Sequence, residues 1–175
     1  MDNITKTKFF VELIKPSHYD DDGYVIQWRK SWIPSNTLAC INALTQDAAD
    51  RNVLGNDVEF VINAYDEMNI VIPVADIIRR FKNEGKHGII FFVGVQSNQF
   101  PRAMDIVKQF LDEDIQVAIG GFHVSGSISM LPELPDELKN ATESGISLFA
   151  GEAEEERLVE VFNDAYQEKL KPIYN

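Results

Sequence analysis

The feature that most constrains the fold is a regular alternation of short apolar runs with amphipathic segments along the chain. The apolar runs have the length of β-strands, and the segments between them repeat apolar residues every three or four positions, as a half-buried helix does. The predicted strands span residues 8–14, 58–66, 88–96, 116–121 and 146–152. The predicted helices span residues 37–51, 73–85, 100–114, 134–145 and 153–170.

Strands that alternate with helices predict a parallel sheet, because each parallel connection has to cross a face of the sheet. The run "GIIFFVGVQ" at 88–96 is almost continuously apolar, which is typical of a strand with helices over both faces. We therefore predict an α/β fold, a flavodoxin-like three-layer sandwich with a five-stranded parallel sheet and helices on both faces. Residues 1–170 would form this domain, and residues 171–175 would begin a linker to a further domain.

The net charge of the chain limits the classes of molecule that it is expected to bind. The formal net charge is −12 and no stretch is strongly basic, which argues against binding to nucleic acid or to anionic membranes. No apolar run approaches the roughly 20 residues that span a bilayer, and the N-terminus has no signal-peptide pattern. We therefore predict a cytoplasmic protein that binds a small ligand or another protein.

Small residues follow three of the predicted strands, at the edge where parallel sheets of this kind bind ligands. Glycine has no Cβ, so a flat or bulky group can lie directly on the backbone there. The dinucleotide motif G-x-G-x-x-G needs several glycines after the first strand, where only Gly23 occurs, and no P-loop is present. The candidate residues are Gly94, Val95, Gln96 and Ser97 after the third strand, Gly120, Gly121, Phe122 and His123 after the fourth, and Ala150, Gly151 and Glu152 after the fifth.

The stretches "VGVQSNQFPRA", "IGGFHVSG" and "GEAEEERL" together resemble the N-terminal cobalamin-binding domain of cobalamin-dependent radical SAM enzymes. The resemblance implies a Rossmann-like domain that holds the cofactor's nucleotide tail between the sheet and its helices. It assigns Gly120 and Gly121 to the glycine pair that admits the tail. It also matches residues 151–152 to a Gly-Glu element after the fifth strand. The segment 94–96 departs from the Ser-x-Leu element that the family often has beside the tail, and Ser97 is the candidate for that polar contact.

The cobalt ligand is the largest departure from the family. Many cobalamin domains carry Asp-x-His-x-x-Gly after the first strand, with the histidine on cobalt, but here Gly23 follows His18 by five residues instead of three. We therefore expect a cofactor with its tail base off cobalt and with no metal ligand from this chain; His18 is the alternative ligand. His123 either contacts the cofactor or is a polar turn residue.

The chain has a single cysteine, Cys40, which we expect to be a small core residue. An iron–sulfur cluster of the radical SAM type needs three thiolates, so this chain alone would not be an enzyme. The resemblance implies that S-adenosylmethionine and the cluster bind in a C-terminal catalytic domain. That domain would transfer methyl groups or direct a radical rearrangement, either in cis or as a partner served by a free-standing carrier.

A cofactor-free interaction or regulatory domain of the same fold is the alternative function. The long loop after the first strand combines the acidic run 20–22 with the aromatic residues Tyr24, Trp28 and Trp32. These side chains could shield a cofactor, dock on another domain or pack over the domain's own helices.

Overall fold

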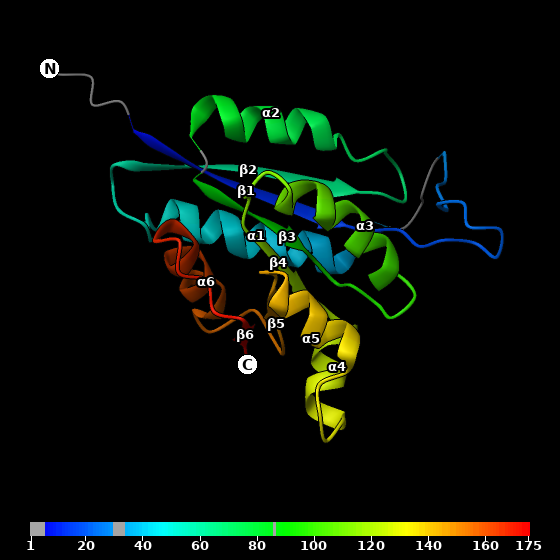
Figure 1. Ribbon diagram of the computed structural model, residues 1–175. Coiled ribbons are helices and arrows are strands. Elements are labelled where there is room, and N and C mark those ends of the chain that lie inside the picture. The colour runs from blue at the N-terminus through cyan, green and yellow to red at the C-terminus, as the bar shows by residue number, and fades with distance from the viewer. Residues whose placement is uncertain (1–5, 30–33, 86) are drawn as a thin grey trace, which may run out of the picture.

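The described residues form a six-stranded parallel β-sheet with helices packed on both of its faces (Figure 1). This computed structural model describes residues 6–29, 34–85 and 87–175, so Trp32 lies outside the described residues. The strands lie in the order β2-β1-β3-β4-β5-β6, and neighbouring strands pair in parallel throughout. The predicted α/β class and parallel sheet are confirmed, whereas the predicted number of five strands is wrong.

The strands are β1 (Thr7–Lys15), β2 (Val58–Asp66), β3 (Gly88–Phe92), β4 (Val117–Gly120), β5 (Ser147–Phe149) and β6 (Ile173–Tyr174). The helices are α1 (Asn36–Asp50), α2 (Val74–Glu84), α3 (Phe100–Leu111), α4 (Phe122–Met130), α5 (Asp136–Glu143) and α6 (Arg157–Tyr166). No described helix is long and apolar enough to cross a membrane.

The sixth strand lies in the segment 171–175, where the sequence predicted the start of a linker. The Leu148 amide donates to Pro172 O at 2.9 Å and the Ala150 amide donates to Tyr174 O at 2.8 Å, so this segment extends the sheet. The Tyr174 hydroxyl also donates to Asp164 on α6 at 2.8 Å. A strand of two residues is too short to show a period of two, which is why the sequence pattern did not indicate it.

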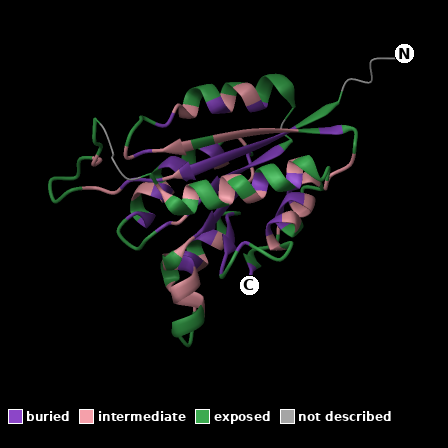
Figure 2. Ribbon diagram, turned by 180° about the vertical axis from the view of Figure 1, so that it is seen from behind, coloured by how far each residue is buried: buried purple, intermediate pink, exposed green. Residues whose placement is uncertain are grey.

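Two hydrophobic cores lie on the two faces of the sheet. Because successive side chains of a strand point to opposite faces, Phe10 packs with the core under α2, α3, α4 and α5, and Phe9 with the core under α1 and α6. The alternation continues through β1, which is buried from Phe9 to Ile14. Figure 2 shows these buried strands enclosed by helices with exposed outer faces. The helices therefore leave the carboxyl edge of the sheet as the place where a ligand can reach the strand ends.

Candidate functional site

A pocket of about 490 Å³ opens at the carboxyl ends of β3, β4 and β5, beside α1. Several predicted site residues line it: Gly94, Gln96, Gly120, Gly121, Phe122, Gly151 and Glu152. The other four, Val95, Ser97, His123 and Ala150, lie close by in the chain but do not line the pocket. The three strand ends that the sequence singled out are thus brought together around one cavity.

Helix α1 forms a wall of this pocket that the sequence reasoning missed. Thr37, Cys40, Ile41 and Leu44 line the cavity at a helical spacing of three and four residues. The Ser35 hydroxyl caps the helix by accepting from the Leu38 amide at 3.2 Å. The expectation that Cys40 belongs to the core is wrong, because its side chain is exposed at the pocket wall.

The pocket lining combines apolar and polar side chains. Phe91, Val93 and Phe149 from the sheet contribute apolar surface, and the Phe91 and Phe149 rings meet edge to face with centroids 5.8 Å apart. The polar lining consists of Asn36, Thr37, Gln96, Ser125, Glu152 and Glu154. A mainly apolar cavity with a few polar groups in its lining is typical of small-molecule and cofactor sites.

Contacts with the protein's own backbone require glycine at position 121, the second of the two glycines after β4. A Cβ on Gly121, which has φ +142°, would overlap Val95 N and lie 2.6 Å from Gly94 C. The Val95 amide donates to Gly120 O at 3.0 Å, and Val95 O accepts from the His123 amide at 3.0 Å. The loop after β3 is therefore hydrogen-bonded onto the turn between β4 and α4, and only glycine fits at position 121.

Arg157, at the start of α6, organises the loop that follows β5. Its guanidinium donates to Ala150 O at 2.7 Å and to Glu152 O at 2.6 Å, and it lies 4.8 Å from the centre of the Phe149 ring. A Cβ on Gly151 would meet this guanidinium at 2.8 Å. The loop is tied to α4 as well, because the Gly151 amide donates to the Ser125 hydroxyl at 3.0 Å.

Lys15, at the end of β1, ties β1 to the loop after β3. Its ammonium donates to Gly94 O at 2.6 Å and to Gln99 Oε1 at 3.1 Å. Burial lowers the pKa of this amine, while the nearby Asp66 carboxylate raises it. A lysine at the end of an apolar run also occurs at solvated strand ends, so this contact could not be predicted from the sequence pattern.

His123 lies in the first turn of α4, not in the loop expected after the fourth strand. Its Nδ1 is 3.1 Å from the Ser97 hydroxyl, and its ring centre is 4.7 Å from that of Phe100. Nε2 is 3.0 Å from Glu137 Oε1, at an angle that makes no hydrogen bond. The structure therefore places His123 against α3 and α5, outside the pocket lining.

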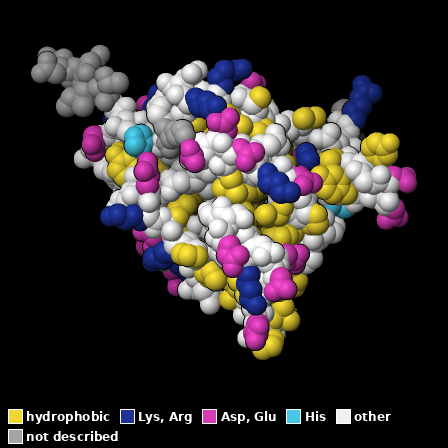
Figure 3. Space-filling view, viewed as in Figure 1, with side chains coloured by type: hydrophobic (Ala, Val, Ile, Leu, Met, Phe, Trp, Pro, Cys, Tyr) yellow, Lys and Arg dark blue, Asp and Glu magenta, His cyan; other side chains and the backbone are white. Residues whose placement is uncertain are grey.

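The loop after β1 is held to its neighbours through its backbone and a few polar side chains. The Ile26 amide donates to His18 O at 2.9 Å, and the Trp28 amide donates to Met68 O at 2.7 Å. Tyr24 and Trp28 remain 73% and 58% exposed. His18 does not line the pocket. In Figure 3 this loop forms a lobe at the right, where hydrophobic side chains lie beside acidic ones.

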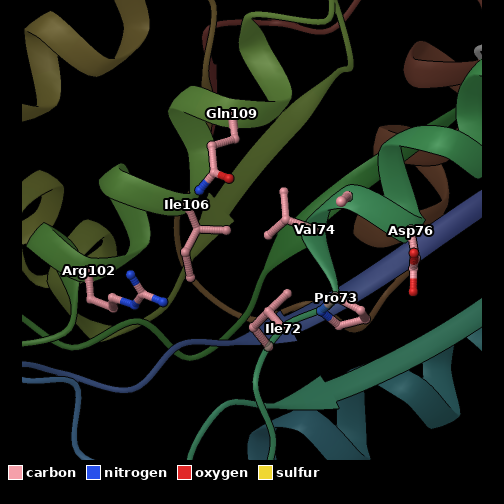
Figure 4. Close-up of a pocket in the computed structure, with 8 residues that line it drawn as sticks. Ile72, Pro73, Val74, Asp76, Arg102, Ile106 and Gln109 are labelled. Atoms are coloured by element: carbon pink, nitrogen blue, oxygen red, sulfur yellow. The ribbon is translucent and has the colours of Figure 1, made fainter.

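A second pocket, of about 340 Å³, lies between the start of α2 and helix α3. Figure 4 shows Arg102, Ile106 and Gln109 of α3 facing the segment 72–74 across it. Arg102 forms an ion pair of 2.6 Å with the buried carboxylate of Glu67, which also accepts from the Ser17 amide. Since its one cationic group is held by an internal ion pair, this pocket is the weaker candidate for a ligand site.

A scan against protein-family models, a search of curated proteins and a search of solved structures each found no match to this chain. Among the described residues, no three His, Cys, Asp or Glu side chains are grouped so that they could hold a metal ion. The shape and chemistry of the pocket at the carboxyl edge are therefore the basis for assigning a ligand.

Proposed function

We propose that the chain is a cobalamin-binding domain with a flavodoxin-like fold that presents its cofactor to a radical SAM catalytic domain, in cis or in trans. The observation that carries the proposal is the pocket at the carboxyl ends of β3, β4 and β5, with an apolar slot between α1 and the sheet. The order β2-β1-β3-β4-β5 within the sheet is that of flavodoxin-like folds, which bind ligands at this edge.

The slot suits the nucleotide tail of cobalamin, which ends in a flat aromatic base. Ile41 and Leu44 of α1 and the aromatic rings of Phe91 and Phe149 supply apolar contacts for such a base. A volume of about 490 Å³ falls within the range of roughly 300–1,000 Å³ that ligand pockets occupy. Asn36 and Thr37, in the first turn of α1, line the pocket, and the N-terminus of a helix would favour the phosphodiester of the tail.

The remaining lining residues would hold the part of the cofactor outside the slot. Gln96, Ser125 and Glu152 offer donors and acceptors to the amide groups around the corrin ring. We propose that the tail base occupies the slot and is therefore off cobalt, and that His18, which does not line the pocket, is not a cobalt ligand. When bound, the corrin cobalt supplies the methyl-transfer or radical chemistry, and the protein supplies binding and orientation.

The catalytic half of the proposed reaction would lie outside this chain. With one cysteine, the chain cannot supply the three thiolates of a radical SAM cluster. S-adenosylmethionine and the cluster would therefore be bound by the catalytic domain, in a methyl transfer or a radical rearrangement.

A cofactor-free interaction domain is the second candidate, and the exposed apolar side chains at one end of the sheet favour it. Tyr24 and Trp28 of the loop after β1 lie on the surface, as does Val71, which is 75% exposed. Clustered apolar groups of this kind are found at protein–protein contacts. The two candidates differ in whether the pocket itself takes up a corrinoid.

The test is binding of hydroxocobalamin to the purified chain, with desalting and a visible spectrum, under both aerobic and anaerobic conditions. We expect retained corrin absorbance at a ratio of about one per chain. Cys40→Phe should abolish retention by filling the slot from α1. Ala39→Phe, an exposed neighbour that does not line the pocket, is the matched control and should bind as the wild type does.

Two results would contradict the proposal. A wild-type chain that stays colourless under both conditions rules out cobalamin and leaves the interaction domain as the better function. Full retention by Cys40→Phe places the ligand somewhere other than this pocket.

A further inference from the structure

We propose that the free edge of β2 is a self-association surface, on which β2 of a second copy of this chain pairs in the antiparallel sense across a two-fold axis. The six-stranded sheets of the two copies would then join into one continuous sheet. The inference goes beyond the proposed function and does not depend on it, because no residue of β2 lines the pocket at the carboxyl ends of β3, β4 and β5.

The two edges of the sheet differ in length. β2 forms one edge with nine residues, and β6 forms the other with two. In Figure 1 these strands lie at opposite margins of the sheet. A very short edge strand is one of the devices by which proteins avoid pairing with other chains. The edge at β6 has this protection, whereas the edge at β2 does not.

The odd-numbered residues of β2 bond to β1 through their backbone. At one end of the ladder the Thr7 amide donates to Asp57 O at 2.9 Å. At the other end the Glu67 amide donates to Lys15 O at 3.0 Å. The two strands pair one to one between these ends, and the bonds of such a ladder recur at every second residue. The N–H and C=O groups of the even-numbered residues of β2 therefore point away from β1.

The even-numbered residues in the middle of β2 have no backbone partner on this outer side among the described residues. Phe60, Ile62 and Ala64 make no hydrogen bond across the edge. At the start of the strand a turn occupies one such group, where the Val58 amide donates to Gly55 O at 3.3 Å. A row of unpaired N–H and C=O groups is a template for a further strand.

The sequence of β2 lacks the features that block an edge. Residues 60–65 contain no proline and no charged side chain, and the pairing with β1 has no bulge. Ala64 is exposed and Phe60 and Ile62 are half-buried, so no described segment covers this edge. Figure 2 shows the strand with intermediate burial beside the buried strands of the sheet. A paired strand would remove the remaining apolar surface from water.

The register of the pairing follows from the free backbone groups and the two-fold axis. A two-fold axis brings the same surface of both copies together. The free N–H groups all meet free C=O groups when Ile62 lies opposite the partner's Ile62, because Phe60 then lies opposite the partner's Ala64. On that face of the sheet a large side chain meets a small one, so the register suits the side chains as well as the backbone.

The charged residues of β2 lie near its two ends, and this register keeps them apart. Glu59 lies opposite the partner's Tyr65, and Asp66 lies opposite the partner's Val58. Like charges directly opposite each other destabilise a pair of strands, and none are opposed within β2 here. The formal net charge of −12 on each chain still opposes association at longer range. Salt screens that repulsion, so association should strengthen as salt is added.

The experiment measures the mass of the purified full chain by analytical ultracentrifugation at protein concentrations up to about 1 mM. We expect a reversible dimer whose dissociation constant falls as the salt concentration rises. A wild type that stays monomeric at every concentration and salt level overturns the proposal.

Ala64→Pro and Ala64→Lys locate the association at this edge. Proline removes an N–H that points away from β1, so the ladder within the chain keeps its bonds. Lysine places a charge among the apolar side chains of the paired edge. Each variant should weaken dimerisation at least about tenfold while urea unfolding stays cooperative. Ala43→Lys, at an exposed position of α1, is the matched control and should dimerise as the wild type does. Normal dimerisation of both Ala64 variants refutes the assignment to β2.

A cross-link tests the register. In a Cys40→Ser background, Ile62→Cys should form a disulfide between copies on mild oxidation, because hydrogen-bonded residues that lie opposite each other have Cα atoms about 5.5 Å apart. Glu59→Cys in the same background is the control, since this register separates the two copies of residue 59 by about 20 Å. Equal cross-linking at positions 62 and 59 would refute the register.

Discussion

Replacement of Gly121 by alanine tests the idea that the glycine pair after β4 is required by the protein's own packing. The added Cβ would overlap Val95 N and lie 2.6 Å from Gly94 C and 2.7 Å from Val95 O, well inside the contact distance of about 3.5 Å. These atoms are backbone, so relief requires moving the whole loop after β3. A ligand channel would have left open space at this point instead.

The loss in the free energy of unfolding follows from the interactions that this movement of the loop would break. The hydrogen bonds Val95 N to Gly120 O and His123 N to Val95 O would be lost, at about 1 kcal/mol each. A φ of +142° in a residue with a side chain costs about 1–3 kcal/mol, and overpacking a similar amount. We expect Gly121→Ala to lower the free energy of unfolding by about 5 kcal/mol, a large part of the roughly 5–15 kcal/mol of a typical domain.

The matched control is Gly126→Ala, five residues further on within α4. Its Cβ would meet only the Phe122 ring, at 3.7 Å and 3.8 Å, an ordinary contact. Alanine in a helix interior should therefore raise stability by about 0.5–1 kcal/mol. Urea unfolding followed by circular dichroism measures both variants. A Gly121→Ala protein within about 1 kcal/mol of the wild type would refute the packing argument.

Two further predictions concern other side chains. The thiol of Cys40, the single cysteine of the chain, should react with a maleimide in the free protein and be protected by bound hydroxocobalamin. Equally fast labelling with and without the cofactor would contradict the position of Cys40 in the pocket wall. Burial in β1 raises the pKa of Glu12 above its ordinary value, although Arg80 opposes this shift. Because the folded-state pKa is the higher one, the wild type should lose stability as pH rises from about 4.3 through that pKa. Glu12→Gln should therefore show a flatter dependence of the free energy of unfolding on pH in urea unfolding, and an unchanged pH profile would contradict this.

Much of the fold could be predicted because buried strands and helix faces produce clear patterns of apolar residues in the sequence. The strands β1, β3, β4 and β5 are buried almost throughout, and α3 repeats buried residues such as Ala103, Val107 and Phe110 at helical spacing. Helix α4 was missed because "FHVSGSISM" is rich in serine and glycine and has one fully buried side chain, Val124. Its helical form depends on contacts with the rest of the fold.

The candidate site was predictable at its strand ends but not at its helix wall. Small residues after consecutive strands indicated the cavity, because parallel strands end at one edge of a sheet. The position of Cys40 in the pocket wall could not be predicted. A helix face that lines a cavity has the same residue spacing as one that packs into a core. The start of α6 was placed four residues too early. Glu155 and Glu156 have φ of +55° and +66°, so the acidic run continues the loop instead of opening the helix.

The two-residue strand β6 gives the pocket a mechanical connection to the far edge of the sheet. Its Tyr174 carbonyl holds the Ala150 amide at 2.8 Å, one residue before the loop that carries Glu152 begins. The Tyr174 hydroxyl also donates to Asp164 of α6, so this strand is bonded both to the helix and to the residue that precedes the loop. The last residues of the chain therefore help to fix the position of the β5 end, from which the pocket-lining loop with Glu152 departs.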